Sequence, residues 1–193
     1  MEYITKSEIK IINEWVKSTK VLFITGNKGI GKSHLADDIY KKFNINYNQI
    51  NTNNLKDKDI YEKIKKTIFT KNILMMIDNK IKKGLLIDDI YVFKKHDKKN
   101  HSKIINLFES KKNFECKIII CLDNEYNTNK INKLLEENYM IRLNYSINIC
   151  KEIVKKRFNN INDNLIIDIL KNNNKNLYST ISDLSFNKDN HKN

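Results

Sequence analysis

Apolar residues recur at helical spacing near the start of the chain. Ile9, Ile12 and Trp15 lie three residues apart, which predicts an amphipathic helix over residues 6–18. A short apolar run at 21–25 then has the length and composition of a buried strand. A stretch containing three glycines follows, and after it apolar residues again recur on one helical face. The pattern predicts helix, strand, glycine loop and helix in that order.

The alternation of apolar runs and amphipathic segments continues through the first three quarters of the chain. Such alternation predicts βαβ units, so the expected fold class is α/β, with a mostly parallel sheet covered by helices on both faces. Further strands are expected at 47–51, 85–87, 117–122 and 139–143, and further helices around 60–68, 73–81 and 104–108.

The pattern changes after residue 143, where three helical stretches follow one another without a strand. They are expected at 147–158, 163–172 and 176–185. We therefore predict a P-loop core over 1–145, a small all-α lid domain over 146–186 and a polar, disordered tail over 187–193.

The glycine loop carries the most specific motif in the chain. Residues 26–33 read Gly-Asn-Lys-Gly-Ile-Gly-Lys-Ser, which fits GxxxxGK[ST] between a strand and a helix. Glycines let successive backbone N–H groups surround phosphates, Lys32 would bridge the β and γ phosphates of ATP, and Ser33 would bind Mg²⁺. The predicted nucleotide-binding residues are Gly26, Asn27, Lys28, Gly29, Ile30, Gly31, Lys32, Ser33 and His34.

Polar residues follow two of the expected strands. Asp88 is placed to be the second protein ligand of Mg²⁺, and Asp89 to orient and deprotonate the attacking water. Asn124, after the next strand, could hold the γ phosphate or that water. The alternatives are that the two acids only begin a loop and that Asn124 is a turn residue. Lys32, Asp89 and Asn124 are thus the predicted catalytic residues, and Ser33 and Asp88 the predicted metal ligands.

The chain has a formal net charge of +13 and a pI near 9.5. An excess of this size attracts polyanions, so primed or duplex DNA is a candidate partner. The same lysine-rich composition would also arise from an AT-rich coding sequence, and arginine occurs only at 142 and 157. Charge alone leaves both explanations open.

Other residue types exclude several kinds of site. Cys116, Cys121 and Cys150 have neither disulfide nor zinc spacing and are expected to be buried thiols, while the scattered histidines are expected at the surface. No run of about 18 apolar residues and no signal peptide occurs, which predicts no membrane partner and an intracellular protein of the nucleus, the cytoplasm or a viral replication compartment.

With these motifs in order, the chain resembles the AAA+ clamp-loader ATPases, most closely the large-subunit type of replication factor C. The resemblance covers about residues 10–186. It rests on the P-loop, on Ile50-Asn-Thr-Asn-Asn54, and on 118–124 followed by 127–134, which is similar to the family's sensor strand and the stretch after it. It implies ATP-dependent loading of a sliding clamp onto primed DNA, together with other clamp-loader subunits.

The sequence departs from that family at several positions. Asn27 and Lys28 replace the usual prolines, Asp89 replaces Glu, and Tyr178 stands where the lid of the family carries a sensor arginine. The Ser-Arg-Cys arginine finger is also missing at 136–138, so the resemblance implies that a neighbouring subunit supplies an arginine in trans. We also expect a version of that family that lacks its C-terminal collar domain.

Other functions remain open from the sequence. Residues 85–90, Leu-Leu-Ile-Asp-Asp-Ile, also look like replication initiators and helicase loaders of the same superfamily. A nucleotide kinase would share the P-loop but usually has an arginine-rich mobile lid. A third possibility is a subunit that binds ATP without turnover.

Overall fold

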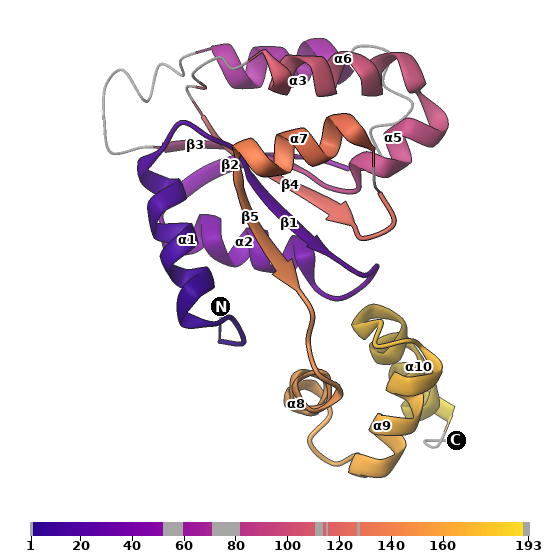
Figure 1. Cartoon of the computed structure of the whole chain (residues 1–193). Coiled ribbons are helices and arrows are strands. Elements are labelled where there is room, and N and C mark those ends of the chain that lie inside the picture. The colour runs from indigo at the N-terminus through magenta and orange to yellow at the C-terminus, as the bar shows by residue number, and fades with distance from the viewer. Residues whose placement is uncertain are drawn as a thin grey trace. The chain divides into compact units, whose positions relative to one another are not determined.

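The computed structural model describes residues 2–51, 60–70, 82–110, 114, 116–126 and 128–190. They divide into two compact units (Figure 1). The first contains Met1–Thr25 and Ser33–Arg142, and the second contains Gly26–Lys32 and Leu143–Asn193. The expected helix at 73–81 lies outside the described residues.

The first unit is built on a five-stranded sheet with the strand order β2-β3-β4-β1-β5. β2 pairs with β3 and β3 with β4 in parallel, which confirms the α/β class. The strands are β1 (Leu22–Gly26), β2 (Ile45–Ile50), β3 (Lys82–Ile87), β4 (Lys117–Asp123) and β5 (Tyr139–Leu143).

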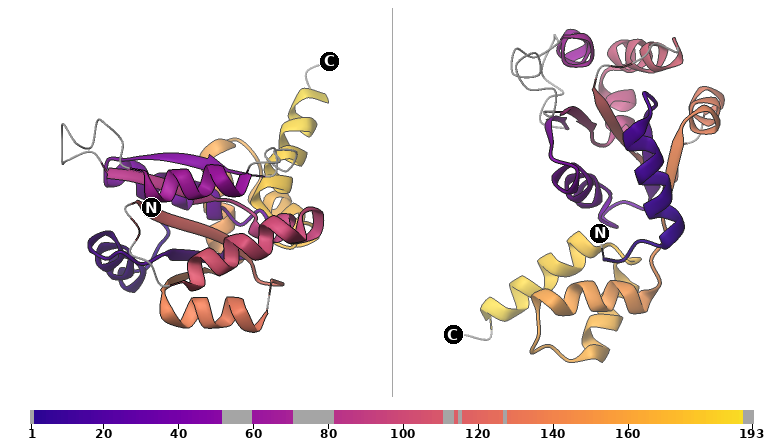
Figure 2. Two further views of the ribbon diagram at one scale, coloured as in Figure 1. Left: turned by 90° about the horizontal axis from the view of Figure 1, so that it is seen from above. Right: turned by 90° about the vertical axis from the view of Figure 1, so that its left-hand side faces the viewer.

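Helices cover this sheet on both faces, as expected (Figure 2). α2 lies on one face, whereas α3 and α7 each contact α6 on the other. The helices of this unit are α1 (Lys6–Lys17), α2 (Lys32–Lys42), α3 (Ile60–Phe69), α5 (Ile90–His96), α6 (Lys98–Glu109) and α7 (Asn129–Glu137).

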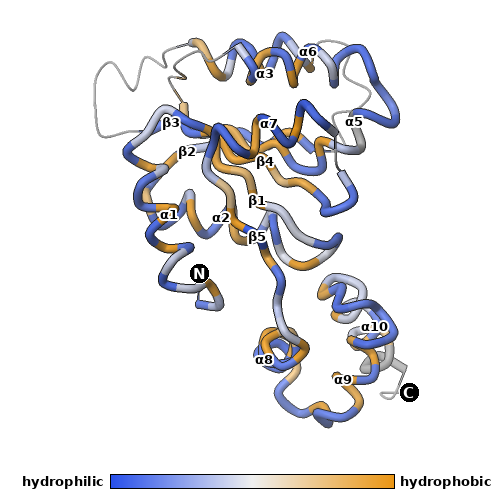
Figure 3. Tube along the Cα trace, in the orientation of Figure 1, coloured by the Kyte–Doolittle hydropathy of each residue, from blue (hydrophilic) through white to orange (hydrophobic). Residues whose placement is uncertain are grey.

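Side chains of the central strands are buried on both faces, which is why these strands are continuous apolar runs (Figure 3). Leu85 and Ile118 belong to the core beneath α3, α6 and α7. On the face of α2, the fully buried Tyr40 donates its hydroxyl hydrogen bond to the backbone oxygen of Leu85 at 2.7 Å and accepts one from the N–H of Ile119 at 3.1 Å. α2 is thereby fixed to the centre of the sheet.

The second unit contains the loop Gly26–Lys32 and the C-terminal helices α8 (Ile147–Arg157), α9 (Asp163–Asn172) and α10 (Leu177–Asn190). Ser146 and Asn162 cap α8 and α9 by accepting backbone N–H hydrogen bonds. Cys150, Val154, Ile166, Leu170 and Leu184 are buried and give these short helices a common apolar core.

Three helical segments differ from the sequence expectation. α5 and α7 were not expected as helices, because α5 has only seven residues and α7 follows the turn after β4 directly. α10 runs to Asn190 and so extends into the segment expected to be a disordered tail.

Candidate nucleotide-binding site

The loop between β1 and α2 has a backbone that depends on its glycines. Gly29 has a φ of 73° and Gly31 a φ of 103°, which L side chains rarely adopt. No described atom lies within 4 Å of the position that a Cβ atom would take on Gly31, so a ligand can approach the backbone there. Ile30, in contrast, is buried and anchors the loop.

Lys32 is the one lysine among the buried residues described, with 5% of its surface exposed. Its Nζ donates hydrogen bonds to the backbone oxygens of Gly26 and Asn27, each at 3.0 Å. The ammonium group is therefore held inside the loop. Since α2 begins at Lys32, the backbone N–H groups of its first turn and the positive end of the helix dipole lie at the same place. The arrangement suits phosphate groups.

The next residue, Ser33, donates a hydrogen bond from Oγ to Oδ2 of Asp88 at 2.7 Å. The N–H of Asp88 donates to the oxygen of Ile50 at 2.8 Å, which continues the β2–β3 pairing beyond the end of β3. A hydroxyl and a carboxylate in contact supply two oxygen ligands of the kind that Mg²⁺ prefers. The predicted metal ligands are thus brought together, and they fit the ion.

Asp89 and Asn124 lie where two neighbouring parallel strands end. β3 and β4 pair with Ile87 opposite Ile120, so their carboxyl ends reach the same edge of the sheet. Asp89 has a φ of 53°, a left-handed conformation that Asp tolerates better than most residues. Asp89 is half-buried and Asn124 is exposed. Their assigned roles in hydrolysis remain predictions.

The start of α10 contacts the loop through a bond that sequence reasoning missed. The N–H of Leu177 donates to the oxygen of Gly29 at 3.0 Å, and Oδ1 of Asn176 caps the helix by accepting from the N–H of Ser179 at 3.1 Å. A Cβ atom on Gly29 would lie 1.9 Å from Oδ1 of Asn176. An Asn directly before a helical segment was the available signal. Tyr178, at the position of the family's sensor arginine, is 79% exposed.

The remaining predicted binding residues, Asn27, Lys28 and His34, are exposed. The three cysteines are buried thiols, as expected. Of the histidines, His101 differs from expectation because it is half-buried and hydrogen-bonded to Tyr126. Where side chains are described, no three His, Cys, Asp or Glu residues gather as a metal site. Across the same ranges, no helix has the length and apolar character needed to cross a bilayer.

Comparison with protein families matched residues 22–149 to the ATPase family associated with various cellular activities (AAA). A search of curated proteins gave no match.

Similar folds occur among solved structures. A DNA replication initiation factor is 19% identical with a TM-score of 0.60, and the alignment covers 96% of this chain and 62% of that one. The replication initiator DnaA bound to AMPPCP and single-stranded DNA is 20% identical with a TM-score of 0.56, covering 95% and 60%. RuvB of Thermotoga maritima is 15% identical with a TM-score of 0.59, covering 94% and 61%. This chain therefore spans about three fifths of their length.

Proposed function

Because this chain belongs to the ATPase family associated with various cellular activities, we propose that it binds ATP and Mg²⁺ through residues 26–33 and Asp88 and hydrolyses the nucleotide. The observation that carries this proposal is the hydrogen bond between Ser33 and Asp88. Ser33 directly follows Lys32, whose ammonium group is buried. These groups supply a cation for phosphate oxygens and a pair of ligands for a divalent ion.

Each residue has a definite task in this proposal. The ammonium of Lys32 gives up its hydrogen bonds to the backbone oxygens of Gly26 and Asn27 and donates to oxygens of the β and γ phosphates instead. The N–H groups of the loop bind the same phosphates. Ser33 and Asp88 would hold Mg²⁺, and the ion when bound would supply positive charge next to the phosphates.

Asp89 orients the attacking water and accepts its proton, and Asn124 positions that water or the γ phosphate. Because Asp is one methylene shorter than Glu, we expect slow hydrolysis.

We further propose that the ATPase acts in DNA replication, as an initiator or helicase loader. Residues 85–90 resemble those proteins, and two of the similar folds are a replication initiation factor and the initiator DnaA. Loading of a sliding clamp is the second candidate, favoured by the resemblance of 118–124 and 127–134 to clamp-loader sensor segments. In both cases the partners are DNA and other ATPase subunits, and residues 146–186 serve as the lid.

ATPase assays distinguish these functions. Stimulation by single-stranded DNA alone supports the initiator or helicase loader, whereas stimulation that needs both primed DNA and a sliding clamp supports the clamp loader. Phosphorylation of a nucleoside monophosphate would instead identify a kinase, and tight ATP binding without turnover in any native complex a passive subunit. Absence of magnesium-dependent ATP binding by the wild-type chain would contradict the whole proposal.

A further inference from the structure

The first unit contains a second place where a ligand could bind, away from the residues of the glycine loop. A cavity of about 570 Å³ lies beside α6 and the turn between β4 and α7. None of its lining residues belongs to 26–34 or to the acidic pair 88–89. Its size is within the usual range of small-molecule sites, about 300–1,000 Å³.

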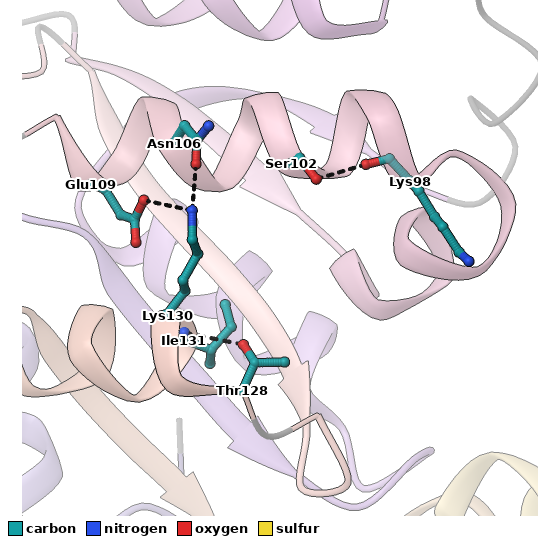
Figure 4. Close-up of polar contacts among 7 residues, drawn as sticks. All are labelled: Lys98, Ser102, Asn106, Glu109, Thr128, Lys130 and Ile131. Carbon is teal, nitrogen blue, oxygen red and sulfur yellow. Dashed lines mark hydrogen bonds and ion pairs between the residues drawn. The ribbon is translucent and has the colours of Figure 1, made fainter.

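Among the described residues that line this cavity, the charged groups are those of Lys94, Lys98 and Lys130, and none is a carboxylate. Nζ of Lys130 is 2.9 Å from Oδ1 of Asn106 and 3.4 Å from Oε2 of Glu109, so its charge is partly neutralised (Figure 4). Within the described ranges, Lys94 and Lys98 have no carboxylate at ion-pair distance. These two lysines could therefore pair with an anionic ligand in the cavity.

One side of the cavity is lined by the half-buried ring of His101, with the buried side chains of Tyr126 and Ile105 beside it. The ring centroids of Tyr126 and His101 are 5.8 Å apart. Nζ of Lys94 lies 5.3 Å from the centroid of the Tyr126 ring. The Tyr126 hydroxyl is hydrogen-bonded to Nε2 of His101, which fixes both rings, whereas Tyr126 and Ile105 are only 4% and 3% exposed. Burial, and secondarily the charge of Lys94, lower the pKa of His101, so this ring is neutral near pH 7. A planar group of a ligand can stack on the accessible part of the His101 ring.

We propose that this cavity binds a nucleotide unit, with its phosphate paired to Lys94 and Lys98 and its base against the ring of His101. A base inside a duplex is stacked and paired, so the unit must come from a single strand or from a free nucleotide. That a single strand is the source rests on the proposed replication function, whereas the chemistry of the cavity does not depend on it.

The cavity is connected to the acidic edge of the sheet along the chain. Lys94 lies on α5, which begins at Ile90 directly after Asp89, and Tyr126 follows Asn124 by two residues. An occupied cavity would therefore hold α5 and the β4–α7 turn together, next to the two residues assigned to hydrolysis.

Fluorescence anisotropy with a 5′-labelled oligothymidylate tests binding at this cavity separately from nucleotide binding at the glycine loop. All proteins carry Lys32→Ala, so that nucleotide binding at the loop does not contribute. Lys94→Gln/Lys98→Gln is compared with Lys10→Gln/Lys17→Gln, which removes the same charge from exposed positions of α1. We expect at least tenfold weaker binding for the first pair and less than twofold for the second. Loss of the one phosphate that both lysines neutralise should also reduce the slope of log affinity against log salt by about 0.7.

Competition identifies the source of the nucleotide unit. If thymidine monophosphate displaces the oligonucleotide at similar concentrations, the ligand is a free nucleotide; if only strands compete, it is a single strand. Equal weakening by the α1 pair would reduce the effect to net charge and overturn the proposal. Binding of polyglutamate but not of oligothymidylate would overturn it in favour of an acidic protein segment.

Localisation and folding are checked separately. A 4-thiothymidine oligonucleotide should crosslink to peptides containing residues 94–106 or 126–130, and thermal unfolding should be unchanged in the Lys94→Gln/Lys98→Gln protein. Crosslinks confined to other peptides would contradict the assignment. Failure of wild-type MgATP binding would count against the proposed function alone.

Discussion

Lys32 combines a charge with nearly complete burial, and its contacts show what it can exchange on binding. Its ammonium donates to two loop carbonyls that phosphate oxygens can replace. Because a charge-assisted hydrogen bond contributes about 1.5–3 kcal/mol, Lys32→Ala should weaken MgATP binding by about 10- to 100-fold or more in isothermal titration calorimetry. Lys42→Ala, at the exposed end of α2, is the control and should bind normally. Unchanged affinity of the Lys32 variant would refute the loop assignment.

Substitutions of the adjacent acids Asp88 and Asp89 are predicted to affect ATP binding and hydrolysis differently. Asp88→Asn removes a carboxylate ligand and should weaken ATP binding in Mg²⁺ by about tenfold or more, with little change in EDTA. Asp89→Asn should leave affinity unchanged and lower kcat by about 100-fold or more, since Asn tolerates the left-handed backbone of this position and only the base is lost. Equal losses of affinity in both variants would remove the water-activating role of Asp89.

The contact between α10 and the loop predicts a dependence of Gly29 on Asn176. Gly29→Ala places a Cβ against Oδ1 of Asn176 and also strains a backbone with positive φ, the latter by about 1–2 kcal/mol. Thermal unfolding should show a marked destabilisation that Asn176→Ala partly relieves, because only the clash is removed. Gly31→Ala has the strain without a neighbour, so Asn176→Ala should not relieve it. If Asn176→Ala changed the stability of the Gly29→Ala and Gly31→Ala proteins equally, the predicted clash between residue 29 and Asn176 would be refuted.

The packing of α6 against the β4–α7 turn predicts a pH dependence through His101. Its pKa in the folded chain is lowered from the ordinary value of 6.5, mainly by burial and then by Lys94. Just below pH 6.5 the unfolded chain therefore binds more protons, and stability falls as pH decreases until the folded-state pKa is passed. His101→Gln should show a smaller loss of melting temperature between pH 7.5 and 5.5 than the wild type. An equal loss would place the acid sensitivity elsewhere.

The sequence predicted the helices and strands where one period of hydrophobicity dominates. α1 and the strands β1 and β4 carry an unambiguous pattern, and the P-loop motif brought Lys32 and Ser33 to the site by spacing alone. α5 was not predicted, because a seven-residue helix spans too few turns to show a hydrophobic period. The bond from Leu177 to Gly29, and the pairing of His101 with Tyr126, depend on contacts between residues distant in the chain, which periodicity does not encode.

The two arginines of the chain decide what it can contribute to an assembly. Arg142 lies on β5 and Arg157 ends α8, and both are exposed. Where clamp-loader subunits that donate a finger carry Ser-Arg-Cys, this chain has Glu136, Glu137 and Asn138. Carboxylates at that position would repel the γ phosphate bound by a neighbour. If the chain acts with other ATPase subunits, as proposed, we expect it to receive an arginine from one of them and to donate none.

An arginine received in trans predicts a large difference between the isolated chain and its native complex. An arginine finger raises turnover by about 10³- to 10⁵-fold, because it neutralises charge that develops on the transferred phosphoryl group. The purified chain should bind MgATP but hydrolyse it very slowly in a phosphate-release assay, whereas the complex isolated through a tag on this chain should be faster by at least 10³-fold. Asp89→Asn in the tagged chain should abolish ATP hydrolysis at the site of this chain only. The turnover that remains then belongs to the sites of the partner subunits. Fast hydrolysis by the isolated chain that disappears on Arg142→Ala or Arg157→Ala would show that the protein supplies its own arginine and that a hetero-oligomer is not required.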